Sequence, residues 1–264
     1  MIKAKTAIQQ FIRSCHLFAF RGNFPSRIGL YLHSLEKSHR NAFAEMINYF
    51  HDAGYRFVDA DDFCNPNAKR VVFLSFDDNY HSWYEALPLF ESLGVRATFY
   101  ANSLPFRDVA DSTEIEGYYD RVNHFNGRIP LSRAEIVEIA NCGHTIGCHG
   151  HSHRPLARLT EDDAKDDIRR GKEELENTLG FGVEHFSYPF GFRRHFRRQL
   201  REYCLKIGFR TIANATPGLQ YREQTPLSIN RNVWRLDRTL SYNLDNICVD
   251  GRMFEFITGR SAVG

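Results

Sequence analysis

Two short segments carry the side chains best suited to chemistry. Asp77 and Asp78 directly follow the apolar run "VVFLSF", and four histidines occur within ten residues, among them His149 and His153. The i, i+4 spacing of this histidine pair would point both imidazoles the same way on one turn of helix. Two neutral imidazoles and one carboxylate form a three-ligand divalent metal site that leaves positions open. We therefore expect one aspartate to bind a metal with the two histidines and the other to remain a free base.

Hydrophobic periodicity predicts the elements that must position these side chains. Apolar, strand-like runs alternate with segments of helical period along most of the 264 residues. This alternation predicts an α/β fold with a parallel sheet, and seven or eight strands favour a closed or nearly closed barrel. Chemistry in such folds lies at the carboxyl ends of the strands, where Asp77 and Asp78 are expected. The expected strands cover residues 27–33, 55–60, 70–76, 95–101, 144–149, 184–191 and 209–215.

Capping residues and glycines predict where the intervening helices begin and end. Ser132 and Glu135 have the spacing of a capping box. Three helices are expected to begin at a capping residue and end at a glycine, from Ser38 to Gly54, from Ser132 to Gly143 and from Thr160 to Gly180. Further helices are expected over 82–93 and 193–207.

The chain is expected to form one domain, because no linker rich in Pro, Gly or Ser divides it. Residues 27–235 form the expected barrel, in which the polar, aperiodic stretch 102–130 is an insertion. Residues 236–264 are expected to be a C-terminal extension packed on the barrel. Residues 1–26 are expected to be an N-terminal helical extension that either closes one end of the core, the alternative we favour, or lies on a membrane surface.

Composition excludes several classes of function. The net charge of +2 gives no general attraction to nucleic acid. No apolar run reaches the roughly 18 residues needed to cross a bilayer. The six cysteines form no C-x-x-C pair, and the N-terminal stretch lacks the apolar core of a secretory signal. We expect reduced thiols and a cytoplasmic protein, with contact to the inner membrane surface as an alternative.

Several motifs in this order resemble those of the polysaccharide deacetylases, the NodB-homology group or carbohydrate esterase family 4. "SFDDN" is similar to the motif T-F-D-D-G, and "HGHSH" to H-[ST]-x-x-H. "FSYPFG" resembles the third motif, and "LGVRATFYA" the strand that follows the first. The similarity covers about residues 27–235 and implies a distorted (β/α)7–8 barrel.

The resemblance also implies roles for individual residues. Asp77 would be the general base, and Asp78, His149 and His153 would bind one divalent metal ion. Zinc is the ion we expect, although cobalt, manganese or iron would fit the same ligands. The backbone N–H of Phe190, after Pro189 and next to Tyr188 in the third motif, would bind the oxyanion.

Three positions depart from the family pattern. The usual late motif Leu-x-His is missing, but "IGLYLH" resembles the start of a permuted subgroup, the poly-N-acetylglucosamine deacetylase type, and makes His33 the expected general acid. Asn79 replaces a glycine, and we expect it to adopt the positive φ there. Arg231 is expected to replace the missing arginine that orients the base in the family.

Four further residues near the motifs are given other roles. His144 is expected to support the ligands by a hydrogen bond and His151 to point away from them. Tyr80 and Trp83 are expected either to stack on a sugar or to pack in the core.

The function that these residues predict is metal-dependent removal of an acetyl group from an N-acetylated sugar, within a glycan, a glycolipid or a surface-polysaccharide precursor. Hydrolysis of a non-sugar amide at the same metal site is one alternative. Loss of catalysis in a glycan-binding homologue is another, although the complete set of acids and histidines disfavours it. Phosphoryl transfer through an aspartate is disfavoured because it would not explain the histidines.

Overall fold

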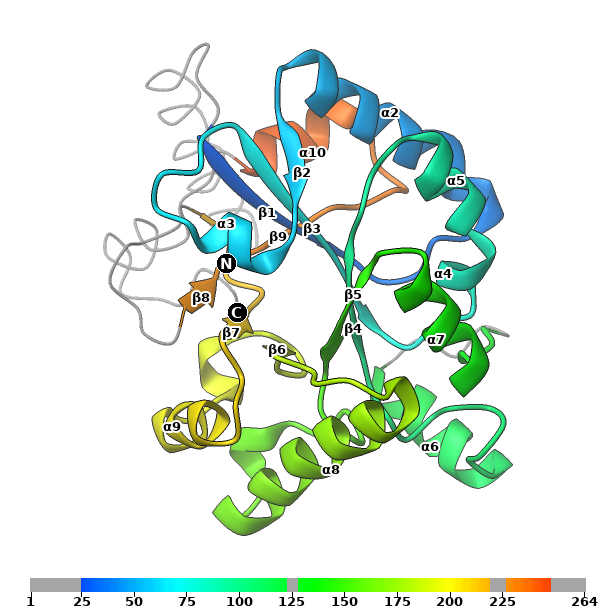
Figure 1. The fold of residues 1–264 in the computed structure, drawn as a ribbon, viewed down its shortest axis with the longest axis vertical. Coiled ribbons are helices and arrows are strands. Elements are labelled where there is room, and N and C mark those ends of the chain that lie inside the picture. The colour runs from blue at the N-terminus through cyan, green and yellow to red at the C-terminus, as the bar shows by residue number, and fades with distance from the viewer. Residues whose placement is uncertain (1–24, 123–127, 219–226, 248–264) are drawn as a thin grey trace, which may run out of the picture.

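The computed structural model describes residues 25–122, 128–218 and 227–247, which form a curled parallel sheet surrounded by helices (Figure 1). The predicted N-terminal helix and most of the predicted C-terminal extension lie outside the described residues. The sheet has nine strands in the order β8-β7-β6-β5-β4-β3-β1-β9, with β2 paired to β3, and every pair is parallel. This arrangement confirms the predicted α/β barrel.

The strands are β1 (Arg27–Leu32), β2 (Arg56–Val58), β3 (Val71–Asp78), β4 (Thr98–Ala101), β5 (Thr145–Cys148), β6 (His185–Ser187), β7 (Thr211–Ala213), β8 (Leu227–Ile229) and β9 (Asn232–Val233). The α-helices are α2 (Arg40–Asp52), α3 (Ala60–Cys64), α4 (Ser82–Glu85), α5 (Leu87–Ser92), α6 (Ser112–Val122), α7 (Arg133–Asn141), α8 (Glu161–Leu179), α9 (Arg198–Lys206) and α10 (Leu240–Ile247). Short 3₁₀ turns are η1 (Lys37–His39), η2 (Leu156–Arg158) and η3 (Arg193–His195). None of the helices in the described ranges combines the length and apolarity needed to cross a bilayer.

The central strand β3 is buried along its whole length, which explains its unbroken apolar sequence. Alternate side chains of β3 serve two apolar cores. Val72, Leu74 and Phe76 belong to the large core that includes the surrounding helices, whereas Val71 and Phe73 belong to a small cluster of strand and α3 residues. This small cluster also contains Ala60, Phe63, Tyr100, Ala213 and Ile229.

The two edge strands of the sheet come from one stretch of chain. Only Asn230 and Arg231 separate β8 from β9, so this stretch brings the two edges of the sheet together. Gly29 on β1 permits the approach, because a Cβ atom there would lie 2.3 Å from the carbonyl oxygen of Asn230. The buried side chain of Arg231 is thereby held inside the curled sheet.

Several helix predictions are confirmed by side-chain contacts. Ser132 and Glu135 form the predicted capping box of α7. Thr160 accepts a hydrogen bond from the Asp163 N–H at the start of α8, and Gly180 ends that helix in the left-handed conformation.

Three local predictions are wrong. Ser38 lies within η1, and His39 precedes α2 without a side-chain cap. The expected helix 82–93 is divided into α4 and α5, with Pro88 in the first turn of the second. The stretch 102–130 was expected to be aperiodic, but it contains α6, which buries Tyr118, Tyr119 and Val122.

The first testable prediction concerns the stability of this fold in acid. Burial, assisted by the charge of Arg96, lowers the pKa of His144 to about 4. The folded protein therefore resists a proton that the unfolded chain accepts below about pH 6.5. The contribution of His144 to the unfolding free energy is therefore fully present above that pH. It decreases by about 1.4 kcal/mol per pH unit as the pH falls towards 4. Urea unfolding of wild type and His144→Gln at pH 7 and pH 5 should show a smaller decrease in the variant.

The control for this prediction is His51→Gln, which changes an exposed histidine. Its decrease in unfolding free energy between pH 7 and pH 5 should match that of the wild type. If the unfolding free energy of His144→Gln decreased as much as that of the wild type, the lowered pKa of His144 would be contradicted.

Candidate active site and metal centre

Asp77 and Asp78 lie at the carboxyl end of β3, and both carboxylates are buried. Successive strand residues normally point to opposite faces. Asp78 has a φ of 82°, in the left-handed region, and this departure from the strand conformation changes the direction of its side chain. The sequence predicted a positive φ at Asn79, and this prediction is wrong. Asn79 instead donates a hydrogen bond to the Asn102 carbonyl (3.0 Å) and accepts one from the Leu131 N–H (2.7 Å).

The structure brings Asp78, His149 and His153 together as one buried cluster. Oδ1 of Asp78 lies 3.5 Å from Nε2 of His149 and 3.2 Å from Nε2 of His153. The two histidines converge from a loop after β5, so the expected turn of helix is absent. A positive φ of 55° at His153 and the turn at Gly150 bring the second imidazole back towards the first.

The donor set of this cluster fits a divalent cation. Nδ1 of His149 lies 2.6 Å from the Ser187 carbonyl oxygen and must donate to it, so Nε2 of the neutral ring carries a lone pair. Burial, against the opposing attraction of Asp78, lowers the pKa of His153, which favours its neutral form. Two imidazole lone pairs would then face one carboxylate oxygen, an arrangement that a shared cation relieves. Ligand atoms about 2.0–2.2 Å from a tetrahedral zinc lie roughly 3.3–3.5 Å apart, close to the distances found here.

Two residues that the sequence did not single out hold the histidine loop in place. Asp167 on α8 accepts hydrogen bonds from the His151 N–H (3.0 Å) and from the Ser152 hydroxyl. Asn102 donates to the carbonyls of His149 (2.6 Å) and Gly150 (3.2 Å). The signal for Asp167 was its place on the buried face of an amphipathic helix, where an unpaired acid would be costly.

Asp77 is held by Arg231. The guanidinium makes two hydrogen bonds to the carboxylate, Nη1 to Oδ1 at 2.6 Å and Nη2 to Oδ2 at 2.8 Å. It also donates to the hydroxyls of Ser75 (2.9 Å) and Ser187 (2.8 Å). Burial would raise the pKa of Asp77, but the charges of Arg231 and His149 and the hydrogen bonds from Arg231 together outweigh it, and the net pKa is below the usual value. The Asp77 carboxylate is therefore fixed in position and ionised, and Arg231 makes the contact with it that the sequence led us to expect.

The second prediction follows from this fork-shaped contact. Arg231→Lys retains the charge but cannot make the same two parallel bonds, so kcat of the hydrolysis expected from the sequence should fall about tenfold or more, while binding of the expected metal ion is retained. Arg231→Met leaves Asp77 buried without its partner and should lower the unfolding free energy by about 3–5 kcal/mol. Activity assays and urea unfolding measure these effects.

The control for Arg231 is Arg238→Lys, at an arginine whose side chain is 57% exposed. Neither its rate nor its unfolding free energy should change. A full wild-type rate in Arg231→Lys would show that Asp77 needs no orientation by the fork.

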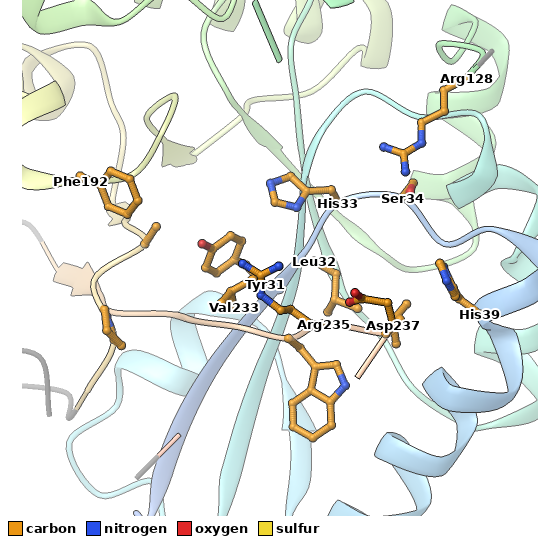
Figure 2. A pocket seen from close by; sticks show the side chains of 14 residues that line it. Tyr31, Leu32, His33, Ser34, His39, Arg128, Phe192, Val233, Arg235 and Asp237 are labelled. Carbon is orange, nitrogen blue, oxygen red and sulfur yellow. The ribbon is translucent and has the colours of Figure 1, made fainter. Parts of the chain in front are cut away.

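His33 directly follows β1 and lies on the wall of a cavity (Figure 2). Its carbonyl accepts a hydrogen bond from Trp83 Nε1 at 2.7 Å, and its ring lies 5.6 Å from that of Tyr31. Burial would raise the pKa of Asp77 and of Asp78, and the charge of His33 is among the smaller of the causes that oppose it and lower both values. The structure thus places His33 near the acid pair.

The third-motif residues occupy two different environments. Phe190 has a φ of 65° and a partly exposed ring 4.8 Å from that of His153, so its ring lies beside the cluster of Asp78, His149 and His153. The Pro189 ring packs against the loop near Gly150. Tyr188 is 5% exposed, and its ring stacks on Phe196 at 4.5 Å, so it belongs to the core and its expected substrate contact is not supported.

The remaining candidates are not members of the cluster of acids and histidines, although Tyr80 contacts it. His144 precedes β5, at the end of the strand away from the metal cluster, and accepts a hydrogen bond from the Ala97 N–H, so its predicted support of the ligands is wrong. His151 contacts Ser103 and Glu174 and points away from Asp78, as predicted. Tyr80 and Trp83 are buried in the core, and the Tyr80 hydroxyl donates to Asp78 Oδ2 at 3.1 Å.

Solved structures of deacetylases share this fold. The Streptococcus pyogenes deacetylase PplD matches with a TM-score of 0.66 and 16% identity, covering 85% of this chain and 99% of that one. IcaB from Ammonifex degensii matches with a TM-score of 0.66 and 19% identity, covering 85% and 97%. At these identities the similarity establishes the fold alone.

Sequence comparison identifies the family. A peptidoglycan-N-acetylglucosamine deacetylase of Bacillus cereus is 36% identical over 56 residues, which are 21% of this chain and 20% of that protein. The chain spans less than half the length of the curated relatives that it matches. The family model for polysaccharide deacetylases matches residues 65–212, more than half of the chain and a range that includes both acids and both histidines of the cluster. The chain therefore belongs to the polysaccharide deacetylase family.

Proposed function

We propose that the protein is a metal-dependent hydrolase that removes the acetyl group from an N-acetylated sugar. The observation that carries the proposal is the convergence of Asp78, His149 and His153 next to a second acid, Asp77, which Arg231 holds. Family membership supports a carbohydrate as the substrate. A divalent cation held by the three ligands would supply a Lewis acid that lowers the pKa of water and polarises the amide carbonyl.

The chain's own residues perform the proton transfers of this proposal. Asp77 accepts the proton of the attacking water as the general base. The backbone N–H of Phe190 donates a hydrogen bond to the oxyanion that develops on the acetyl carbonyl. His33 then protonates the leaving amine nitrogen, and its position on the cavity wall supports this role. The products are acetate and the free amino sugar.

Acetate release separates this function from the alternatives. The zinc-loaded protein should release acetate from N-acetylglucosamine oligomers much faster than from small non-sugar amides. Faster hydrolysis of the non-sugar amides would support the alternative function, a metal-dependent hydrolase of non-sugar amides. If wild type and Asp77→Asn both bind the oligomers and neither releases acetate, the chain is a binding protein.

The third prediction tests His33 as the acid. His33→Gln should lower kcat for the amide substrate by about 10²- to 10⁴-fold, because the amine leaves poorly without a proton. The loss should be much smaller for 4-nitrophenyl acetate, whose leaving group needs no protonation. His51→Gln on the exposed surface serves as the control. Equal losses on amide and ester would assign His33 a structural role.

A further inference from the structure

A cavity of about 690 Å³ is lined by residues of β1 and β9 and of the segments that follow these strands (Figure 2). Its lining includes His33, the general acid of the proposed function, together with Tyr31 and, across from them, Phe192. The Tyr31 ring also lies 5.0 Å from the guanidinium carbon of Arg231, which holds Asp77. The volume is in the range of sites that hold small ligands, and the aromatic rings suit the faces of a sugar. The cavity can thus hold a sugar ring next to His33.

The charges around this cavity are unevenly paired. Arg128 faces Glu36 (3.7 Å), and Asp237 faces Arg238 (3.6 Å). Arg235 is exposed and has no carboxylate within ion-pair distance among the described residues. Its side chain extends towards Tyr31 and His33 in Figure 2, and its charge acts on the Tyr31 hydroxyl. The cavity therefore presents one uncompensated guanidinium next to the expected position of the sugar.

We propose that Arg235 binds an anionic group of the substrate, a phosphate or a carboxylate attached to the N-acetylated sugar. This inference rests on the proposed function and adds the substrate class to it. A guanidinium fork matches the oxygens of either anion, and an arginine without a competing carboxylate is available for that contact. Asp77 does not compete, because Arg231 already occupies both of its oxygens.

The expected effect is a preference for acidic over neutral sugars. A hydrogen bond to a charged partner contributes enough to favour the anionic substrate by about tenfold. Because Arg235 is exposed, the preference should weaken as ionic strength rises. N-acetylglucosamine provides the neutral reference, its 1- and 6-phosphates test a phosphate, and N-acetylmuramic acid tests a carboxylate.

The experiment measures kcat/KM for acetate release by the zinc-loaded protein and its variants. Wild type should favour at least one acidic sugar about tenfold, and the favoured compound identifies phosphate or carboxylate as the group. Arg235→Gln should abolish the preference, Arg235→Lys should retain part of it, and the control Arg198→Gln, at a side chain 90% exposed on α9, should retain all of it. Equal rates on acidic and neutral sugars in wild type, or a preference that survives Arg235→Gln, would overturn the inference.

A binding measurement separates this inference from the proposed function. Calorimetry compares the affinities of glucosamine, its phosphates and muramic acid, and requires no turnover. Tighter binding of an acidic sugar that Arg235→Gln abolishes supports the anion site even if no acetate is released. Equal affinities for glucosamine and for its acidic derivatives contradict it even if the neutral substrate is hydrolysed.

Discussion

Asp77→Asn should lower kcat for acetate release by about 10²- to 10⁴-fold, the usual contribution of a general base. The amide has nearly the shape of the carboxylate and can still accept a hydrogen bond from Arg231, but it cannot take a proton from water. Metal content should be unchanged, because Asp78, His149 and His153 supply the ligand atoms of the cluster. The measurement is steady-state acetate release with the metal content of the same samples.

Loss of the buried charge pair has a second consequence for Asp77→Asn. Arg231 loses its carboxylate partner, and the unfolding free energy should fall by up to about 3–5 kcal/mol. Assays must therefore be made at a temperature where the variant is folded. Asp166→Asn, at a side chain 53% exposed on α8, is the matched control and should retain the wild-type rate. A folded, metal-loaded Asp77→Asn with the wild-type rate would exclude Asp77 as the base.

Alanine at Asp78, His149 or His153 should remove the metal and reduce acetate release to background. Each residue supplies one of three protein ligands, and a site with two is both weaker and poorly positioned for catalysis. Zinc binding also stabilises the folded state, by about 2.7 kcal/mol when free zinc exceeds the dissociation constant 100-fold. Thermal unfolding with and without zinc should therefore show a rise in Tm for wild type and almost none for the three variants.

His151→Gln is the control for the ligand variants, because this histidine lies in the same loop but contacts Ser103 and Glu174. Its Tm should still rise with zinc. An equal rise in Tm for His149→Ala or His153→Ala would place the zinc elsewhere in the protein.

The alternation of strands and helices could be predicted from sequence because burial imposes it locally. β3 is covered on both faces and is therefore apolar throughout, and α8 carries both its cap and its glycine stop. α6 could not be predicted because its buried face is built from Tyr118 and Tyr119 within an otherwise polar segment. β8 and β9 are too short to give a periodic signal, and their place depends on pairing with β7 and β1.

The acids and histidines of the site could be predicted from their types and from strand ends, but their geometry could not. The left-handed φ of Asp78 and the loop that returns His153 to His149 depend on contacts with distant residues, such as Asn102 and Asp167. The contact of Arg231 with Asp77 was expected from the family resemblance, but its geometry spans 154 positions and follows from the way β8 and β9 bring the sheet edges together. The position of Arg235 in a cavity likewise follows from the fold rather than from a local pattern.

Acetate release from N-acetylated oligosaccharides before and after metal removal tests the central claim most directly. The protein is treated with a chelator, freed of it, assayed, and then assayed again with one equivalent of zinc. Joint binding of one cation by Asp78, His149 and His153 predicts loss of nearly all activity in the metal-free protein and its return with zinc. Acetate release by the metal-free protein at the untreated rate would contradict the claim.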